Sequence, residues 1–300
     1  MIHRTTYHYP VGATGSQNEV RLMPLHDKSQ ALLAFELRTT PQSHIHWYEE
    51  PGGMVHTFGI SEPHTELDII AESLIETFPK PAFWGLNLIH PDVSIYFSES
   101  AREQFAEYLL PSLYVDHGSG ALEFMPRIDH QNDCVANYMV TLCSAVHAFL
   151  EYRQDVTSVH TSVNEVVAIR GGVCQDFSHF MIACCRDQGI PARYVSGYLV
   201  SEGEEHLRGE MATHAWVEVP IYDELGQTFR WLSLDPTNNL VASDRYVRVH
   251  TGVDYSDVSP IKGTYIGLPA SSMDVKVRVR RYENYDKKEL LNSAGSKSKK

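Results

Sequence analysis

The sequence predicts an α+β fold in two parts, an N-terminal β-sandwich or barrel followed by an α+β core with an antiparallel sheet. Short strand-like runs fill residues 2–78, apolar stripes at helical spacing follow between residues 133 and 188, and strand-like runs return after residue 190. The chain has 300 residues, of which 43% are hydrophobic. Since a domain takes roughly 150 residues, both parts can build a core.

The N-terminal part has the pattern of a sheet with one face in water. Leu33, Phe35 and Leu37 alternate with small or charged residues, which is the period of a strand. Three prolines between residues 79 and 91 remove backbone donors and disfavour helix, so we place the domain boundary there. The predicted domains are an N-terminal β domain over residues 1–80, a catalytic domain over residues 81–285 and a disordered polar tail over residues 286–300.

The second part begins with helices and ends with strands. Ser162 and Glu165 have the spacing of a capping box and open a short helix that stops at the glycines before residue 173. The runs ARYVSGYLV, THAWVEV, RWLSLD and MDVKVRVRR then predict the strands of a second sheet. A longer helix from Asp133 is indicated by an apolar stripe of Val135, Met139, Leu142, Val146 and Phe149.

Charge and composition exclude several classes of partner. The net charge of −13 repels a phosphate backbone, so we expect no nucleic-acid partner. The N-terminus MIHRTTYHYPVG lacks the apolar core of a secretory signal, and no run is long and apolar enough to span a bilayer. Five cysteines, an odd number, are typical of reduced thiols. We therefore expect a soluble cytoplasmic protein without a membrane partner.

Cys174 is the candidate nucleophile. It follows Gly171 and Gly172 and precedes an apolar stripe at helical spacing, which places it at the N-terminus of a helix. Unpaired backbone N–H groups and the helix dipole stabilise a thiolate at such a position. The alternative is an inert buried thiol, and a neighbouring base decides between the two.

His214 is the candidate base, and Asp235 is its candidate partner. His214 and Trp216 share one face of a predicted strand, and Ser233 and Asp235 share a face of the next. A hairpin centred between Glu224 and Leu225 would set His214 directly opposite Asp235. Since a slip of one residue would put the two side chains on opposite faces, the pairing depends on the turn.

A metal site is the competing interpretation of cysteine and histidine. The sequence has no CxxC or HxxxH pair, and Cys174 and His179 lie about 140° apart around a helix. We therefore expect no metal and no cofactor.

The motifs together resemble a known family. GVCQDFSHF, GIPARYVSGY, THAWVEV, LDPTNN and TGVDYSDVSPIKGTYIG are similar, in this order, to successive blocks of the bacterial transglutaminase-like proteins of the papain-like cysteine-enzyme superfamily. NEVRLMPL and PHTEL resemble the β domain that precedes the catalytic core in that family. EEPGGMVHTF departs from the family, which usually has an Asp and a Gly-Asn pair in this strand.

The resemblance implies a transglutaminase-like core with Cys174 as nucleophile, His214 as general base and then acid, and Asp235 as the orienting carboxylate. A thioester would form on a peptide or γ-glutamyl-type amide and be resolved by water or by an amine. We favour water, because no feature of the sequence indicates a dedicated amine-binding site. The alternative is a non-catalytic binding or scaffold protein that keeps the fold.

Further residues are candidates for contact with a peptide or protein substrate. The backbone N–H of Cys174 is a candidate oxyanion donor. Trp216 shares the face of His214 and would line an aromatic groove, although a large ring on an inward face also packs in a core. Asp254, Tyr255 and Asp257 match a family block with no assigned role. The candidate substrate-binding residues are Trp216, Gln175, Asp176 and Tyr194.

Overall fold

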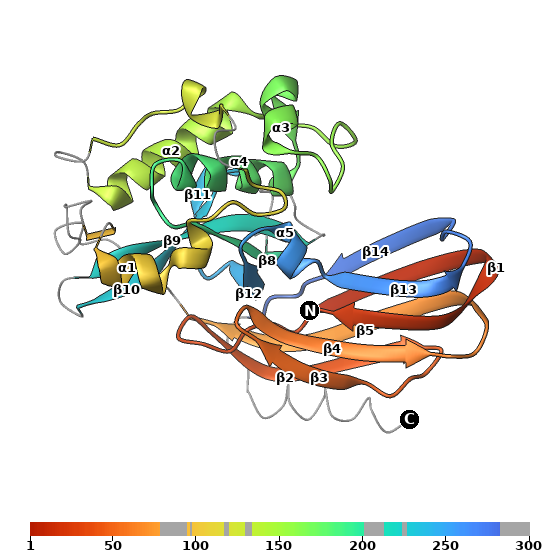
Figure 1. Ribbon diagram of the computed structural model, residues 1–300. Coiled ribbons are helices and arrows are strands. Elements are labelled where there is room, and N and C mark those ends of the chain that lie inside the picture. The colour runs from red at the N-terminus through yellow and green to blue at the C-terminus, as the bar shows by residue number, and fades with distance from the viewer. Residues whose placement is uncertain are drawn as a thin grey trace.

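The computed structural model describes residues 1–78, 95–96, 98–116, 120–129, 134–200, 213–223 and 227–282. It confirms the predicted α+β class, with an N-terminal β region and a core in which helices lie on an antiparallel sheet (Figure 1). The predicted boundary near residue 80 and the predicted tail over residues 286–300 lie outside the described residues. None of the described helices is both long enough and apolar enough to cross a membrane.

The N-terminal region is one curled antiparallel sheet built around a single long strand. Residues 2–8 of that strand pair with the fifth strand of the chain, whereas residues 16–20 pair with the fourth, so the sheet bends between the two halves. The order of the first five strands in the sheet is β2-β5-β1-β4-β3. These strands are β1 (Ile2–Val20), β2 (Gln30–Thr40), β3 (His46–Glu50), β4 (Gly53–Ile60) and β5 (His64–Thr77).

Two C-terminal strands, β13 (Ile261–Gly267) and β14 (Ser272–Arg278), also belong to this N-terminal sheet. Both pair with β1, for example Lys262 with Glu19 and Val275 with Thr5. The prediction that the MDVKVRVRR strand joins the second sheet is therefore wrong, and so is its place within a catalytic domain over residues 81–285. Alternation predicts a strand but carries no information about its partner.

The core sheet has the strand order β11-β10-β9-β8-β12, and helices cover one of its faces (Figure 1). The capping box at Ser162 and Glu165 is confirmed, because each side chain accepts the backbone N–H of the other. The strands are β8 (Arg193–Leu199), β9 (His214–Asp223), β10 (Thr228–Asp235), β11 (Leu240–Val241) and β12 (Tyr246–Gly252). The remaining elements are α1 (Glu99–Gln104), the 3₁₀ helices η3 (Ala106–Tyr108) and η4 (Ala121–Phe124), α2 (Val135–Phe149), the short strands β6 (Glu151–Tyr152) and β7 (Gly171–Gly172), α3 (Val163–Ile169), α4 (Cys174–Arg186) and α5 (Tyr255–Val258).

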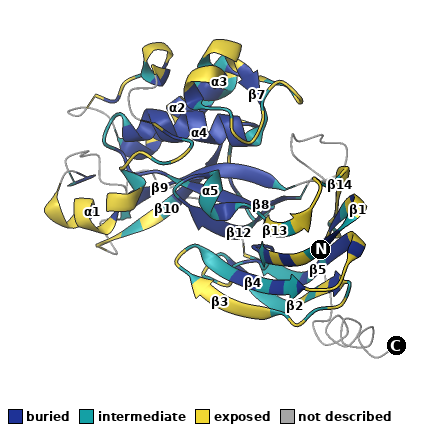
Figure 2. Ribbon diagram, turned by 45° about the vertical axis from the view of Figure 1, so that its right-hand side comes forward, coloured by how far each residue is buried: buried dark blue, intermediate teal, exposed yellow. Residues whose placement is uncertain are grey.

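Helix α4 is the buried centre of the core. Every residue from Gln175 to Arg186 is buried, and the helix packs between α2 and strand β9 (Figure 2). Its apolar side chains join the main hydrophobic cluster, so the position of the first residue, Cys174, is fixed by the packing of the whole helix.

Strand β12 of the core contacts the N-terminal sheet. The side chain of Gln30 donates to the carbonyl oxygens of Leu25 and Arg248, both at 2.8 Å, and accepts the Arg248 N–H at 2.8 Å. On the neighbouring strand, the Tyr198 hydroxyl lies 2.7 Å from Nδ1 of His3. These buried polar contacts fix the N-terminal region against the core sheet.

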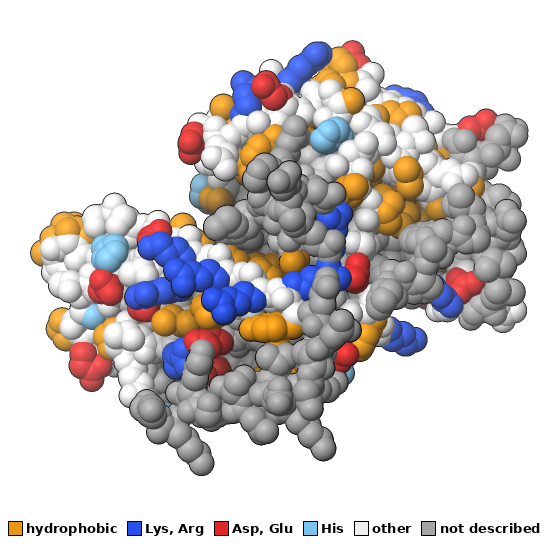
Figure 3. Space-filling model, turned by 180° about the vertical axis from the view of Figure 1, so that it is seen from behind, with side chains coloured by type: hydrophobic (Ala, Val, Ile, Leu, Met, Phe, Trp, Pro, Cys, Tyr) orange, Lys and Arg blue, Asp and Glu red, His pale blue; other side chains and the backbone are white. Residues whose placement is uncertain are grey.

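Seen from behind, Lys and Arg side chains gather on the N-terminal region beside acidic ones (Figure 3). On its sheet, Arg4 pairs with Asp68 at 2.7 Å and Lys276 pairs with Asp274 at 2.5 Å. Because the pairs are exposed on at least one side, each contributes little to stability.

Candidate active site

Cys174 is the first residue of α4, as the sequence predicts. The preceding β7 brings the chain close to the start of the helix: a Cβ on Gly172 would lie 2.3 Å from Oδ2 of Asp176. Only glycine fits there without moving that carboxylate. The thiol of Cys174 is half-buried at the helix terminus, where the first N–H groups lack helical partners.

Asp176 supports the start of this helix. Its Oδ2 accepts the Val173 N–H at 2.7 Å and the Thr157 hydroxyl at 2.7 Å. Burial raises the pKa of this carboxyl group above its usual value. Asp176 does not line the pocket described below, so the structure gives it a capping position in place of the predicted substrate contact.

His214 and Asp235 are brought together, but not in the predicted register. Strand β10 pairs with β9 through Ser233 opposite Glu218 and Leu234 opposite Val217, which is two residues away from the predicted pairing. Because side chains alternate with a period of two, a shift of two residues keeps both groups on the same face. Nε2 of His214 lies 2.7 Å from Oδ2 of Asp235, and both side chains are fully buried.

The carboxylate of Asp235 is held by a dense set of donors. Its Oδ1 accepts the backbone N–H groups of Thr237 at 2.9 Å and Asn238 at 3.2 Å. Its Oδ2 accepts the Asn238 side-chain amide at 2.8 Å and the Tyr246 hydroxyl at 2.8 Å, in addition to His214. A buried carboxylate with this many donors keeps one orientation and keeps its charge.

The environment favours an imidazolium at His214. Burial alone would lower the pKa of His214, but the charge and hydrogen bond of Asp235, with a further contribution from Cys174, raise it to about 10. Burial alone would raise the pKa of Asp235, and its hydrogen bonds together with the charge of His214 lower it instead. With Nε2 engaged by Asp235, Nδ1 is the ring nitrogen left for exchange of a proton with Cys174.

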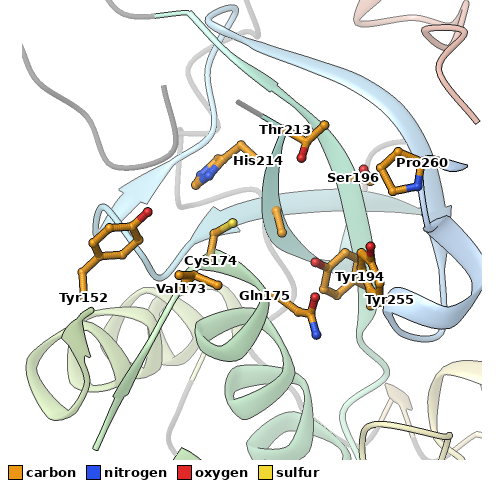
Figure 4. Close-up of a pocket in the computed structure, with 11 residues that line it drawn as sticks. Tyr152, Val173, Cys174, Gln175, Tyr194, Ser196, Thr213, His214, Tyr255 and Pro260 are labelled. Carbon is orange, nitrogen blue, oxygen red and sulfur yellow. The ribbon is translucent and has the colours of Figure 1, made fainter. Parts of the chain in front are cut away.

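Cys174 and His214 open into a pocket of about 260 Å³ (Figure 4). Cys174 enters it from the end of α4 and His214 from β9, while two tyrosines form the wall on the side of β8 and α5. The lining residues are Tyr152, Val173, Cys174, Gln175, Tyr194, Ser196, Thr213, His214, Ala215, Tyr255 and Pro260.

Two of the predicted substrate-binding residues, Gln175 and Tyr194, line this pocket. Trp216 does not: it is fully buried in a cluster with Val195, Leu199, Ala242 and Tyr246, so the groove predicted for it is wrong and the core alternative holds. Trp231 is half-buried on β10, under the Arg193 guanidinium, which lies 3.7 Å from the ring centroid.

Sequence reasoning missed several groups at the site. Asn238 had a local signal, because it follows Asp235 by three residues in LDPTNN. Tyr246 had none, since it reaches Asp235 from a different strand. The pocket residues that were not predicted are Tyr152, Val173, Ser196, Thr213, Ala215 and Pro260.

The other four cysteines differ from Cys174 in their surroundings. All five thiols are free. Cys143, Cys184 and Cys185 are buried, and burial raises the pKa of each, whereas Cys134 is half-buried like Cys174. Across the described ranges, no group of three or more His, Cys, Asp and Glu side chains could hold a metal ion.

The acidic residues of the TGVDYSDV block shape the turn into α5. Oδ1 of Asp254 accepts the Ser256 N–H at 2.7 Å, and its Oδ2 accepts the Tyr114 N–H at 2.9 Å. Oδ2 of Asp257 accepts the Val253 N–H at 2.9 Å. Both carboxylates therefore satisfy backbone donors around the pocket wall that contains Tyr255.

The fold and the site together define a class: a cysteine at a helix start, beside a buried imidazole–carboxylate pair on an antiparallel sheet, is a transglutaminase-like core of the general cysteine-enzyme type. Comparison with known families agrees. Residues 127–236 match the transglutaminase-like superfamily, and residues 1–76 match the bacterial transglutaminase-like N-terminal region.

Relatives extend this similarity over almost the whole chain. An uncharacterized protein of Mycobacterium leprae is 32% identical over 289 residues, which cover 94% of this chain and 98% of the relative. One from Mycobacterium tuberculosis is 33% identical over 298 residues, which cover 94% and 92%. The chain belongs to the transglutaminase-like family with a bacterial transglutaminase-like N-terminal region.

A solved structure shares the fold. The chain superposes on a Cytophaga hutchinsonii protein, described as a candidate cysteine protease, with a TM-score of 0.70 and 21% sequence identity. The superposition covers 96% of this chain and 93% of that one. The arrangement of both sheets thus recurs at low sequence identity.

Proposed function

We propose that this protein is a cysteine acyl-transfer enzyme that forms a thioester between Cys174 and the acyl group of a peptide or γ-glutamyl-type amide. The observation that carries the proposal is the 2.7 Å contact between His214 and Asp235 at the pocket that Cys174 also lines. An oriented imidazole next to a thiol at a helix terminus is how cysteine nucleophiles are activated.

The proposed reaction begins with attack of the Cys174 sulfur on the amide carbonyl carbon. Nδ1 of His214 already holds the proton of the thiol, because Asp235 favours the charged ring, so the sulfur attacks as a thiolate and the carbonyl oxygen takes up negative charge beside the N–H groups at the start of α4. The imidazolium then gives this proton to the departing nitrogen, so the C–N bond breaks as ammonia or an amine leaves.

In the second half of the reaction, water or an amine attacks the thioester. His214 accepts a proton from the attacking group and keeps it at Nδ1 as the C–S bond breaks and the thiolate leaves, which restores the starting pair. Asp235 keeps the ring oriented and stabilises its charged form throughout, without becoming protonated. Water gives amidase or peptidase activity, and an amine gives a cross-linked product.

The first test is the reactivity of Cys174 toward iodoacetamide at neutral pH. We expect Cys174 to be carboxamidomethylated at least tenfold faster than free glutathione, read by mass spectrometry of the tryptic peptide. Cys134 is the internal control, because it is also half-buried but lies outside the pocket. A Cys174 that reacts no faster than glutathione or Cys134 supports the non-catalytic binding alternative.

The second test identifies the acceptor. A library of blocked peptides is incubated with the enzyme, with and without a primary amine, and mass spectrometry records cleavage, ammonia loss or amine adducts. We expect products that disappear in Cys174→Ala. A gain of about 1 Da in peptide mass, from one NH₂ replaced by OH, indicates hydrolysis of a side-chain amide, whereas an adduct indicates transfer to the amine.

A further inference from the structure

His179 is a second buried histidine near the pocket, and the proposed chemistry does not use it. It lies in α4, is 1% exposed, and its Nε2 accepts the backbone N–H of Tyr255 at 3.2 Å. Tyr255 is the first residue of α5, where a backbone N–H has no partner within the helix. His179 supplies that partner from 76 residues away in the sequence.

The ring of His179 also packs against the tyrosines around the pocket. The ring centroid of Tyr194 lies 5.1 Å from that of His179. The ring of Tyr114 stacks on His179, with the centroids 5.5 Å apart and an interplanar angle of 13°. Tyr194 and Tyr255 contact each other at 6.4 Å and both line the pocket, whereas His179 does not. His179 therefore lies behind the wall, where it contacts the ring of Tyr194 and the backbone N–H of Tyr255.

The protonation state of His179 suits this contact. Burial lowers its pKa to about 4, although the nearby Asp254 opposes the effect. The ring is thus neutral at pH 7, and Nε2 has a lone pair free to accept the Tyr255 N–H. Asp254 completes the arrangement, since it holds Ser256 and Tyr114 on either side of this contact.

We propose that His179 is a positioning residue that fixes the Tyr194–Tyr255 wall of the pocket, and that this wall holds the group attached to the reacting acyl carbon. The inference rests on the proposed function of Cys174. It gives the GVCQDFSHF and TGVDYSDV blocks a shared physical purpose, because one supplies the acceptor and the other supplies the N–H that it holds.

The experiment compares two alkylating agents of different size on the full chain. Iodoacetamide needs only the thiol, whereas N-benzyliodoacetamide also needs the wall, so its reaction with Cys174 should saturate. In His179→Leu, which removes the acceptor, we expect the half-saturating concentration of the benzyl reagent to rise about tenfold, the size of one lost backbone hydrogen bond. Its limiting rate and the iodoacetamide rate should stay within about twofold of wild type.

Three companion variants make the outcome decisive. His179→Gln can place an oxygen acceptor near the position of Nε2 and should restore wild-type behaviour. Tyr255→Ala removes one of the two rings of the wall and should raise the half-saturating concentration at least as much as His179→Leu. The double variant of His179→Leu and Tyr255→Ala should be no worse than Tyr255→Ala alone, because the ring that His179 positions is already gone.

The proposal is overturned if Tyr255→Ala leaves the benzyl reagent unaffected, and this result decides the matter even if His179→Leu does not fold. It is also overturned if His179→Gln is as impaired as His179→Leu, or if His179→Leu slows both reagents equally. If Cys174 of the wild type reacts no faster than glutathione, the proposed function itself is overturned. If the wild type reacts fast and His179→Leu has the same half-saturating concentration as the wild type, only the role of His179 is overturned.

Discussion

The surroundings of His214 and His179 form a natural comparison within one molecule. Both rings are 1% exposed, yet the pKa of His214 is raised to about 10 and that of His179 is lowered to about 4. His214 contacts a carboxylate at 2.7 Å, whereas the nitrogen of His179 accepts a backbone N–H. Burial alone disfavours the charged ring, and a directly bonded carboxylate reverses the outcome.

The two histidines therefore have different roles around the pocket. A ring that can hold a proton beside a thiol serves chemistry, while a ring kept neutral serves as a fixed acceptor. The most direct test of this difference is to remove the carboxylate that contacts His214, because this contact distinguishes His214 from His179.

Asp235→Asn should have the largest effect. The amide cannot hold the charged ring and presents a donor where a carboxylate is needed, so kcat should fall about 10³- to 10⁴-fold. The pKa of His214, followed by NMR titration, should fall below its ordinary value as burial takes over. An Asp235→Ala protein with wild-type kcat would show that Asp235 only supports the turn after β10.

Trp216→Ala tests the core that lies beside His214. Trp216 is fully buried, with its ring 6.2 Å from that of His214, so truncation should lower the free energy of unfolding by about 3–5 kcal/mol. Turnover per folded molecule should change little, because Trp216 does not line the pocket. Urea denaturation and active-site titration separate the two; a stable variant with reduced kcat/KM would contradict the core assignment.

The free energy of unfolding at acid pH, the acid limb of the stability profile, tests the state of His179. Its pKa is lowered in the fold from 6.5 to about 4, so the folded protein binds fewer protons than the unfolded chain and loses stability as the pH falls from 6.5 to 4. The loss due to this one ring should approach about 3 kcal/mol. His179→Gln should flatten that slope in urea titrations at several pH values, whereas His44→Gln, at an exposed site, should leave it unchanged.

The free energy of unfolding at alkaline pH, the alkaline limb of the profile, depends on His214. Because the pKa of His214 is raised to about 10, its contribution to stability is complete below pH 6.5 and is lost as the pH rises toward 10. Asp235→Asn should remove this limb and leave the acid limb of His179 in place. Equal loss of both limbs would mean that the two histidines share one environment.

Tyr246→Phe should have the smallest effect of the series. It removes one of the donors to Oδ2 of Asp235, and Asn238 and His214 remain, so kcat should fall about tenfold. Tyr198→Phe is the matched control, because that buried phenol bonds to His3 and not to Asp235. A loss in Tyr246→Phe no larger than in the control would remove Tyr246 from the set that orients the carboxylate.

Local patterns predicted the chemistry on the His214 side of the comparison. The glycines before Cys174 and the helical stripe after it placed the thiol correctly at a helix start. The face shared by His214 and Asp235 held although the register was wrong by two residues, because the side-chain period of a strand is two. Chain topology was harder: the alternation in β14 predicts a strand but not its pairing with β1.

The His179 side could not be predicted, because its partner lies far away in the sequence. No spacing rule connects His179 with Tyr255, and the contact exists only once α4 and α5 pack together. Trp216 had the same difficulty, since its position on the face of His214 suited both a groove and a core until its neighbours from β8 and β12 were known. Long-range packing, which the local sequence does not encode, decided both cases.

The most direct test of the central claim is capture of the acyl-enzyme. The protein is mixed with an activated acyl ester, such as a blocked glutamyl p-nitrophenyl ester, quenched in acid and digested for mass spectrometry. We expect the acyl mass on the Cys174 peptide, its absence in Cys174→Ala, and its strong reduction in His214→Ala. A Cys174 that iodoacetamide alkylates rapidly but that never carries an acyl group would contradict the account.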